Sequence, residues 1–178
     1  MAEIILMSHL PSVVSEAGMH NDVELAPGSR DLAGRYEHHM EGVSTFLSSS
    51  YRSAIETTYT LAAASGVRWR PLLRHEPFFP SFNDHDHWQT NVERFLTGDV
   101  VYDLEGSSAD NVKKDICFSV ETTLKALPDE QLLALIGSPV QLALLAEASG
   151  EAKACSAFKM LHHGEVLKVS CLKDLVHR

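Results

Sequence analysis

Histidine is the residue type that stands out in this sequence, with ten copies among 178 residues. His85 and His87 lie in a stretch broken by prolines, and alternate residues of an extended chain project to the same side. They are therefore predicted to bind one divalent metal ion, with His75 or Glu76 as a third ligand. Imidazole and carboxylate are ligands that suit Zn²⁺. The alternative is a solvated polar loop whose aspartates cap the next helix.

The same middle segment carries three phenylalanines next to prolines, Phe78 and Phe79 between Pro77 and Pro80 and Phe82 just after them. Aromatic side chains in a proline-bounded stretch are typical of an exposed anchor that fills a pocket on a partner protein. The alternative is a loop that folds back over the core of its own domain.

Arg68, Trp69 and Arg70 form a basic aromatic patch just before that segment. If these residues are extended, both arginines point one way and the tryptophan points inward. Arginine forks bind phosphate groups and carboxylates. The patch is therefore a candidate binding site for a phosphate or an acidic partner, unless it pairs with the acidic surface of its own chain.

Motifs that mark nucleophilic or nucleotide-dependent enzymes are absent from the sequence. It contains no GxSxG, no P-loop and no GxGxxG. Cys117 lies on an apolar stripe, where burial would raise its pKa and make it a poor nucleophile. The three cysteines form no CxxC pair and no disulfide framework, which favours a reduced, cytoplasmic protein.

Charge and hydropathy exclude several classes of partner. Asp and Glu number 24 against 15 Lys and Arg, giving a net charge of −9, which opposes binding to nucleic acid. No apolar run approaches the roughly 20 residues that span a bilayer, and the N-terminus lacks the features of a signal peptide. We therefore expect no nucleic-acid partner and no membrane contact. The acidic surface would steer the chain towards a partner with a basic surface.

Apolar periodicity and turn residues predict an α+β fold. We expect one predominantly helical globular domain over residues 1–178, in which residues 10–30 form an irregular, mobile segment. Helices are predicted at 31–64 (as one helix or two), 88–96, 109–127, 129–136 and 139–149. Strands are predicted at 4–7 and 100–102 and in a C-terminal hairpin of 155–161 with 165–172, although 151–161 also fits a helix. About five helices would thus surround a small sheet.

These observations favour a non-enzymatic binding protein: an inhibitor, adaptor or assembly factor that acts through protein–protein contacts and needs no cofactor. The alternative is a metal-dependent hydrolase in which a zinc ion at His85 and His87 activates water. A third hypothesis is an oligomeric structural protein, in which the apolar segments between residues 132 and 148 pack against a second copy.

Overall fold

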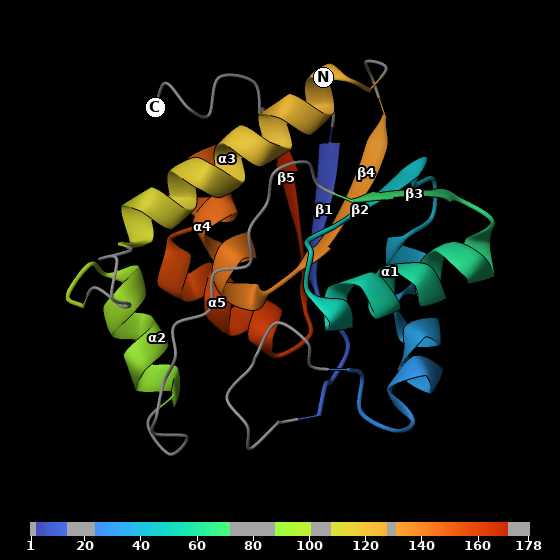
Figure 1. Ribbon diagram of the computed structural model, residues 1–178, viewed down its shortest axis with the longest axis horizontal. Helices are drawn as coiled ribbons and strands as arrows, with labels where there is room; N and C mark the ends of the chain where they lie inside the picture. The colour runs from blue at the N-terminus through green and yellow to red at the C-terminus, as the bar shows by residue number, and fades with distance from the viewer. Residues whose placement is uncertain (1–2, 14–23, 72–87, 101–107, 128–130, 171–178) are drawn as a thin grey trace.

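The computed structural model of the chain describes residues 3–13, 24–71, 88–100, 108–127 and 131–170. Strands and helices alternate through these residues. The strands are β1 (Glu3–Ser8), β2 (Thr45–Ser48), β3 (Arg68–Pro71), β4 (Leu132–Gly137) and β5 (Val166–Ser170). The helices are η2 (Ser29–His39, a 3₁₀ helix), α1 (Arg52–Ser65), α2 (Trp88–Leu96), α3 (Ala109–Lys125), α4 (Pro139–Ser149) and α5 (Ala154–His162). Figure 1 shows their arrangement.

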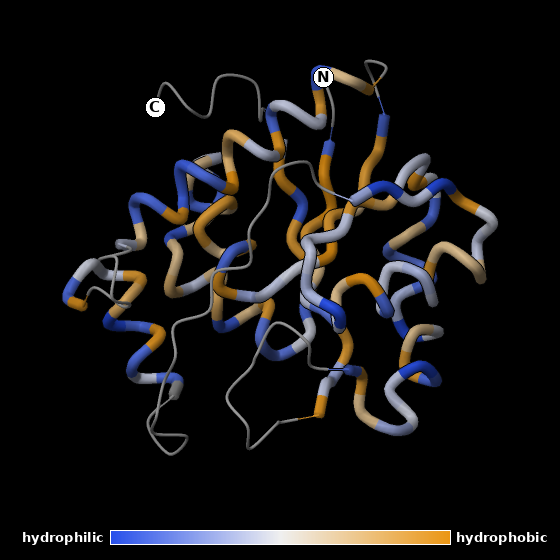
Figure 2. The backbone as a smooth tube through the Cα atoms, in the orientation of Figure 1, coloured by the Kyte–Doolittle hydropathy of each residue, from blue (hydrophilic) through white to orange (hydrophobic). Residues whose placement is uncertain are grey.

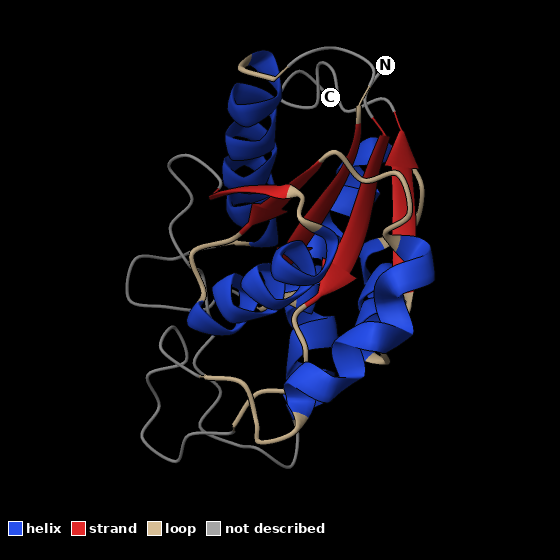
Figure 3. Ribbon diagram, turned by 90° about the vertical axis from the view of Figure 1, so that its right-hand side faces the viewer, coloured by secondary structure: helices blue, strands red, loops and turns tan. Residues whose placement is uncertain are grey.

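The strands form one mixed sheet in the order β3-β2-β4-β1-β5. β1, β2, β3 and β4 run parallel to their neighbours, and only β5 at the edge is antiparallel, opposite β1. Helices cover both sides of this sheet (Figure 3). Because the parallel strands share one direction, β1, β4 and β2 end at the same edge of the sheet.

The alternation of side chains along β1 divides the interior into two cores. Ile4 and Leu6 face the larger core, which contains apolar residues of α2, α3, α4 and α5. Ile5 and Met7 face the smaller core, which is closed by α1 and η2. A strand buried on both faces has an apolar residue at every position. Figure 2 accordingly shows the central strands as strongly hydrophobic segments.

The helices that cover the larger core have start and stop signals readable from the sequence. Ser108 caps α3, and its hydroxyl accepts a bond from the backbone N–H of Asn111 at 3.3 Å. α4 begins with Pro139 in its first turn and ends at Gly150, whose φ of 83° is the left-handed conformation that favours glycine. Among the described residues, no helix is long and apolar enough to cross a membrane.

The structure corrects the predicted α+β class to an α/β fold. The described residues contain five α-helices and one 3₁₀ helix, which agrees with the prediction of about five helices. The sheet, however, has five strands and is mostly parallel, rather than the small sheet with a C-terminal hairpin that was predicted. The main cause is residues 132–136, predicted as part of a helix, which form the central strand β4. A short continuous apolar run fits a buried strand as well as a helix.

Two further predictions about elements are wrong. The segment 31–64 is neither one helix nor two: a 3₁₀ helix, a buried strand and α1 follow one another. The C-terminal hairpin is absent, because residues 154–162 form α5, which confirms the helical alternative for 151–161, and only the second arm is a strand, β5, which pairs with β1. The apolar residues of β4 and α4 are buried within the chain, so the structure gives the oligomer hypothesis no exposed apolar face there. Most of the predicted 100–102 strand lies outside the described residues.

Candidate active site at the carboxyl edge of the sheet

Three strands of the sheet end side by side in small polar residues and one histidine. β1 is followed by His9, β2 by Ser49, and β4 by Ser138. The backbone N–H of His9 donates to the carbonyl oxygen of Gly137 at 3.1 Å, which joins the ends of β1 and β4. In open α/β sheets, ligands bind outside the carboxyl ends of the strands. This edge is therefore where a site is expected.

His9 has the geometry of a nucleophile. Its ring nitrogen Nδ1 lies 2.9 Å from the backbone carbonyl oxygen of Leu10. A carbonyl oxygen only accepts hydrogen bonds, so Nδ1 carries the proton and Nε2 keeps its lone pair. Burial lowers the pKa of His9 below its usual value, and the charge of His162 lowers it further. The side chain is only half-buried. At neutral pH, His9 is thus an uncharged base whose Nε2 keeps its lone pair.

Helix α1 holds the peptide that orients this histidine. The backbone N–H of Leu10 donates to Thr57 Oγ1 at 3.0 Å. Thr57 Oγ1 in turn donates to the carbonyl oxygen of Ser53 at 2.8 Å, within the same helix. Leu10 and Thr57 are both buried. The carbonyl that fixes the protonated nitrogen of His9 is therefore anchored, through its own residue, to a helix of the core.

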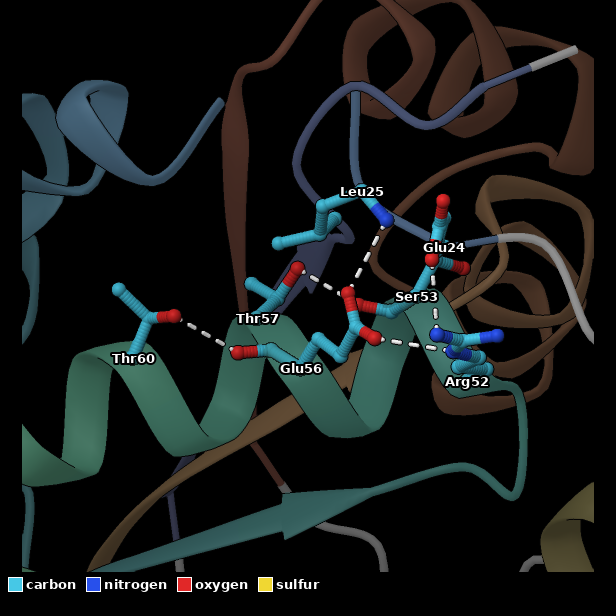
Figure 4. A network of polar contacts seen from close by, with 7 residues as sticks. All are labelled: Glu24, Leu25, Arg52, Ser53, Glu56, Thr57 and Thr60. Carbon is cyan, nitrogen blue, oxygen red and sulfur yellow. Dashed lines mark hydrogen bonds and ion pairs between the residues drawn. The ribbon is translucent and has the colours of Figure 1, made fainter. Parts of the chain in front are cut away.

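The chain that returns from residue 24 is anchored to the same turn of α1 (Figure 4). The backbone N–H of Leu25 donates to Glu56 Oε2 at 3.0 Å. Arg52 bridges two carboxylates, with Nε 3.0 Å from Glu56 Oε1 and Nη2 2.8 Å from Glu24 Oε2. The bond from Leu25, together with Arg52, lowers the pKa of Glu56. Leu25 also bridges to Ser12, so the described ends of the predicted irregular segment are tied down.

A second histidine reaches the same edge from α5. β5 runs antiparallel to β1 with Val166 opposite Met7, so the end of α5 lies close to the end of β1. His162 stacks on Phe158 with ring centroids 5.5 Å apart. Burial, and then the charge of His163, lower the pKa of His162. Of the described charged groups, His162 alone shifts the pKa of His9 through its charge.

Most of the side chains predicted from the sequence to form sites lie outside the described residues. These are the candidate metal ligands and the three aromatic anchors: His75, His85, His87, Phe78, Phe79 and Phe82. Their roles stay predictions. Within the described part of the chain, no group of three or more His, Cys, Asp or Glu is placed to hold a metal ion.

The basic aromatic patch is described and lies on the edge strand β3. Arg68, Trp69 and Arg70 are all exposed, so the expectation that Trp69 packs inward is wrong. Its Nε1–H donates to Ser48 Oγ at 3.0 Å, while 38% of the residue remains exposed. An edge strand has no second neighbour to cover it, which explains this exposure. Cys117 is buried as predicted, and burial raises its pKa to about 12.

Sequence reasoning missed His9 and Thr57. The run Ile4–Met7 predicts the strand that forms β1, but that prediction does not extend to the histidine two residues after it. The available signal was a histidine directly after a fully apolar strand. That signal identifies a site only once the strand is known to be parallel and central, because only then do other strand ends meet it.

Comparison with known proteins supports the fold and not a family assignment. No protein-family model matches the sequence, and no curated protein matches it significantly. Solved structures do match over nearly the whole chain. A phosphoserine phosphatase from Entamoeba histolytica, in complex with 3-phosphoglyceric acid, has a TM-score of 0.64 at 15% identity and covers 99% of this chain and 100% of its own.

Two mycobacterial structures give similar values. A glucosyl-3-phosphoglycerate phosphatase in complex with VO3 has a TM-score of 0.65 at 16% identity, covering 98% of this chain and 93% of its own. A structure described as mycobacterial hydrolase 1 has a TM-score of 0.69 at 14% identity, covering 93% and 89%. The chain therefore shares the α/β fold of these phosphatase and hydrolase structures.

This result corrects the function predicted from the sequence. The prediction of a non-enzymatic inhibitor, adaptor or assembly factor is wrong, because the solved structures that share this fold are phosphatases and hydrolases. The absence of known nucleophile motifs therefore does not exclude an enzyme, because those motifs mark only some classes of nucleophile.

Proposed function

We propose that this chain is a phosphatase that hydrolyses phosphate monoesters through a covalent phosphohistidine at His9. The observation that carries the proposal is the bond from Nδ1 of His9 to the carbonyl oxygen of Leu10, which leaves Nε2 as the nucleophile at the carboxyl edge of the sheet. Two of the structural neighbours are a phosphoserine phosphatase and a glucosyl-3-phosphoglycerate phosphatase, which supports this reaction class.

The reaction has two balanced steps. First, the lone pair of His9 Nε2 forms a bond to phosphorus while the bond from phosphorus to the ester oxygen breaks, and the departing oxygen takes a proton from water. Second, a water oxygen attacks phosphorus and loses a proton. The nitrogen–phosphorus bond then breaks, its electron pair returns to Nε2, and inorganic phosphate leaves.

The carbonyl oxygen of Leu10 has a role in both steps. When Nε2 bonds to phosphorus, the imidazole ring becomes positively charged while Nδ1 keeps its proton. A carbonyl oxygen fixed 2.9 Å from Nδ1 stabilises this charge without having to move. Thr57 holds Leu10 in place, so we assign Thr57 as a positioning residue rather than a catalytic one.

The direct test is to replace His9. The variant His9→Gln keeps a polar side chain but removes the ring nucleophile, so we expect release of phosphate from p-nitrophenyl phosphate to fall at least about 1,000-fold. His38→Gln, at an exposed histidine on η2, is the matched control and should retain full activity. Equal rates for wild type and His9→Gln would contradict the proposal.

The zinc site predicted at His75, His85 and His87 is a separate hypothesis that the same assay can separate from this one. A reaction carried by His9 has no step through those histidines, so prolonged dialysis against a chelator should leave the rate unchanged. A rate that is lost on dialysis and restored by Zn²⁺ would instead favour the metal-dependent hydrolase.

A further inference from the structure

Strand β3 forms an edge of the sheet that no other described strand covers. The strand order leaves β3 with β2 as its one neighbour among the described residues (Figure 1). All four residues of the strand, Arg68–Pro71, are exposed. The backbone N–H and C=O groups that point away from β2 therefore have no strand to bond to. Such an edge is a template for one more strand.

The side chains of β3 differ between its two faces. Trp69 pairs with Phe46 of β2, whose side chain lies in the smaller core. Arg70 pairs with Leu47, whose side chain lies in the larger core. Paired residues of neighbouring strands point to the same face of a sheet. Trp69 therefore lies on the face that α1 covers, whereas Arg68 and Arg70 share the opposite face.

The two arginines have no partner within the described part of the chain. Neither Arg68 nor Arg70 forms an ion pair or a side-chain hydrogen bond there, although the whole chain has a net charge of −9. By contrast, Arg52 on α1 binds two carboxylates. Guanidinium groups suit carboxylates in particular, because their planar donors match the two carboxylate oxygens. The edge thus offers two positive charges that a carboxylate of another molecule can reach.

The tryptophan gives the opposite face of this edge an apolar contact. Its Nε1–H donates to Ser48 Oγ at 3.0 Å, which holds the indole ring against β2. The residue is still 38% exposed. An indole that is held in place and partly open contributes apolar contact area to a partner at little cost in side-chain entropy. An added strand would therefore meet positive charge on one face and an aromatic ring on the other.

Charge decides which kind of strand fits this edge. A second copy of β3 would set its own arginines against Arg68 and Arg70, and like charges across a strand pair are destabilising. A strand with carboxylates at alternate positions would instead place opposite charges side by side. Charge complementarity therefore favours an acidic strand over a second copy of this chain.

We propose that β3 binds an extended acidic segment of a partner protein, which adds to the sheet as a sixth strand. Acidic and apolar residues alternate in that segment, so that carboxylates face Arg68 and Arg70 while an apolar side chain contacts Trp69. The main-chain bonds of an added strand provide affinity, and its alternate side chains provide specificity. The inference is independent of the proposed function, because β2 and β4 separate β3 from β1 and from His9.

The test uses a fluorescently labelled, capped heptapeptide in which glutamates alternate with isoleucines, and it measures binding by fluorescence anisotropy. The double variant Arg68→Glu with Arg70→Glu should bind this peptide about tenfold more weakly or worse, because two attractions become repulsions. Arg94→Glu, at an exposed arginine on α2, is the matched control and should bind as the wild type does.

A charge exchange shows that the double variant is folded. With lysines in place of the glutamates, the same peptide should bind the double variant more tightly than it binds the wild type. If the double variant binds neither peptide, its circular dichroism spectrum and melting temperature must match those of the wild type. A folded double variant that does not prefer the lysine peptide overturns the role of the two arginines.

Methylation of the peptide backbone tests whether the partner adds as a strand. Only alternate N–H groups of an added strand face its neighbour. Of two glutamate peptides that are N-methylated at the two alternate sets of residues, one should therefore lose binding and the other should keep it. If both keep binding equally, the peptide does not pair with the backbone of β3 and strand addition is overturned.

The remaining outcomes are equally decisive. Absence of binding between the wild type and the glutamate peptide overturns the proposal, and so does binding that the double variant keeps in full. A wild-type dimer in light scattering that the glutamate peptide does not dissociate would assign the edge to a second copy instead. His9→Gln should bind the peptide as the wild type does, whether or not the chain is a phosphatase.

Discussion

The helices α1 and α4 both contribute buried polar side chains near the carboxyl edge of the sheet, but they differ in whether those side chains are hydrogen-bonded. On α1, Thr57 and Thr58 donate to backbone carbonyls one turn earlier, at 2.8 and 2.7 Å, and Thr57 also accepts from Leu10. In the first turn of α4, the side chain of Gln141 makes no hydrogen bond, and neither does the hydroxyl of Ser49 after β2. Both threonine hydroxyls on α1 therefore have hydrogen-bond partners within the protein.

This difference separates positioning from binding. A satisfied buried hydroxyl holds two parts of the chain at a fixed distance, as Thr57 does for the loop after β1. An unsatisfied one lowers stability unless a ligand pairs with it. Proteins accept such local costs mainly at functional sites. The comparison therefore assigns α1 to holding the loop that carries His9, whereas the buried side chains of Ser49 and Gln141 hold no other part of the described chain in place.

The largest stability effect is expected at Thr57. Thr57→Val removes the acceptor for Leu10 and leaves a buried N–H unpaired, so we expect a loss of about 1–3 kcal/mol in the free energy of unfolding. Turnover should also fall, because the carbonyl that orients His9 is no longer held. Urea denaturation and a steady-state assay measure the two effects.

Two neighbouring variants control that experiment. Thr57→Ser keeps the hydroxyl and should restore most of the turnover. Thr58→Val removes only a bond to the carbonyl of Ala54 within α1, so its turnover should be normal. If Thr57→Val and Thr58→Val behave alike in both measurements, α1 has no special role in positioning His9.

The pH dependence of the rate should report the lowered pKa of His9. Attack on phosphorus needs neutral Nε2, and burial lowers the pKa of His9 below about 6.5, the ordinary value. The rate should thus already be on its plateau at pH 7 and fall only at lower pH. The stability contribution of His9 should likewise be present above about pH 6.5 and be lost as the pH falls through the lowered pKa.

Comparison with His9→Gln isolates this contribution. Melting temperatures of the wild type and of His9→Gln, measured from pH 8 downwards, should differ by an amount that changes below about pH 6.5, with the wild type losing more stability. A rate that is half-maximal well above pH 7 would mean that His9 is not the uncharged base described here.

The smallest effect is expected at the surface of α1. Glu24→Gln breaks an ion pair with Arg52 in which the two side chains are 57% and 44% exposed. Exposed pairs contribute little, so the loss should be below about 1 kcal/mol and should shrink further in high salt. A loss of unfolding free energy as large as that of Thr57→Val would contradict this ranking. It would show that the ion pairs of Arg52, and not the buried threonine, hold the chain around Leu10 and Leu25 against α1.

The sequence predicted those elements whose signals are local. The stripe of α3 and its cap at Ser108, and the Pro139 start of α4, were all readable and are confirmed. The strand β4 was not, because Leu132–Ile136 is apolar at every position and a short run of that kind has no period. Misreading β4 as a helix removed the centre of the sheet from the predicted fold.

The candidate site could not be predicted from the sequence for the same reason. Ser49, His9 and Gly137 are separated by tens of residues, and they meet only because β2, β1 and β4 are parallel neighbours. Parallel pairing joins distant parts of the chain, and no sequence pattern around any one of these residues indicates it. The histidines that do cluster in the sequence, at 75, 85 and 87, instead predict a metal site in another part of the chain.

The central claim is that His9 carries the phosphoryl group, and trapping that intermediate tests it most directly. The wild-type protein would be mixed with p-nitrophenyl phosphate, quenched in base, in which phosphohistidine is stable, and digested for peptide mass spectrometry. We predict one added phosphoryl group on the peptide that contains His9, and none in the His9→Gln variant. Turnover with the phosphoryl group on another residue, or with no protein-bound phosphoryl group in a quench fast enough to sample a single turnover, would contradict the account.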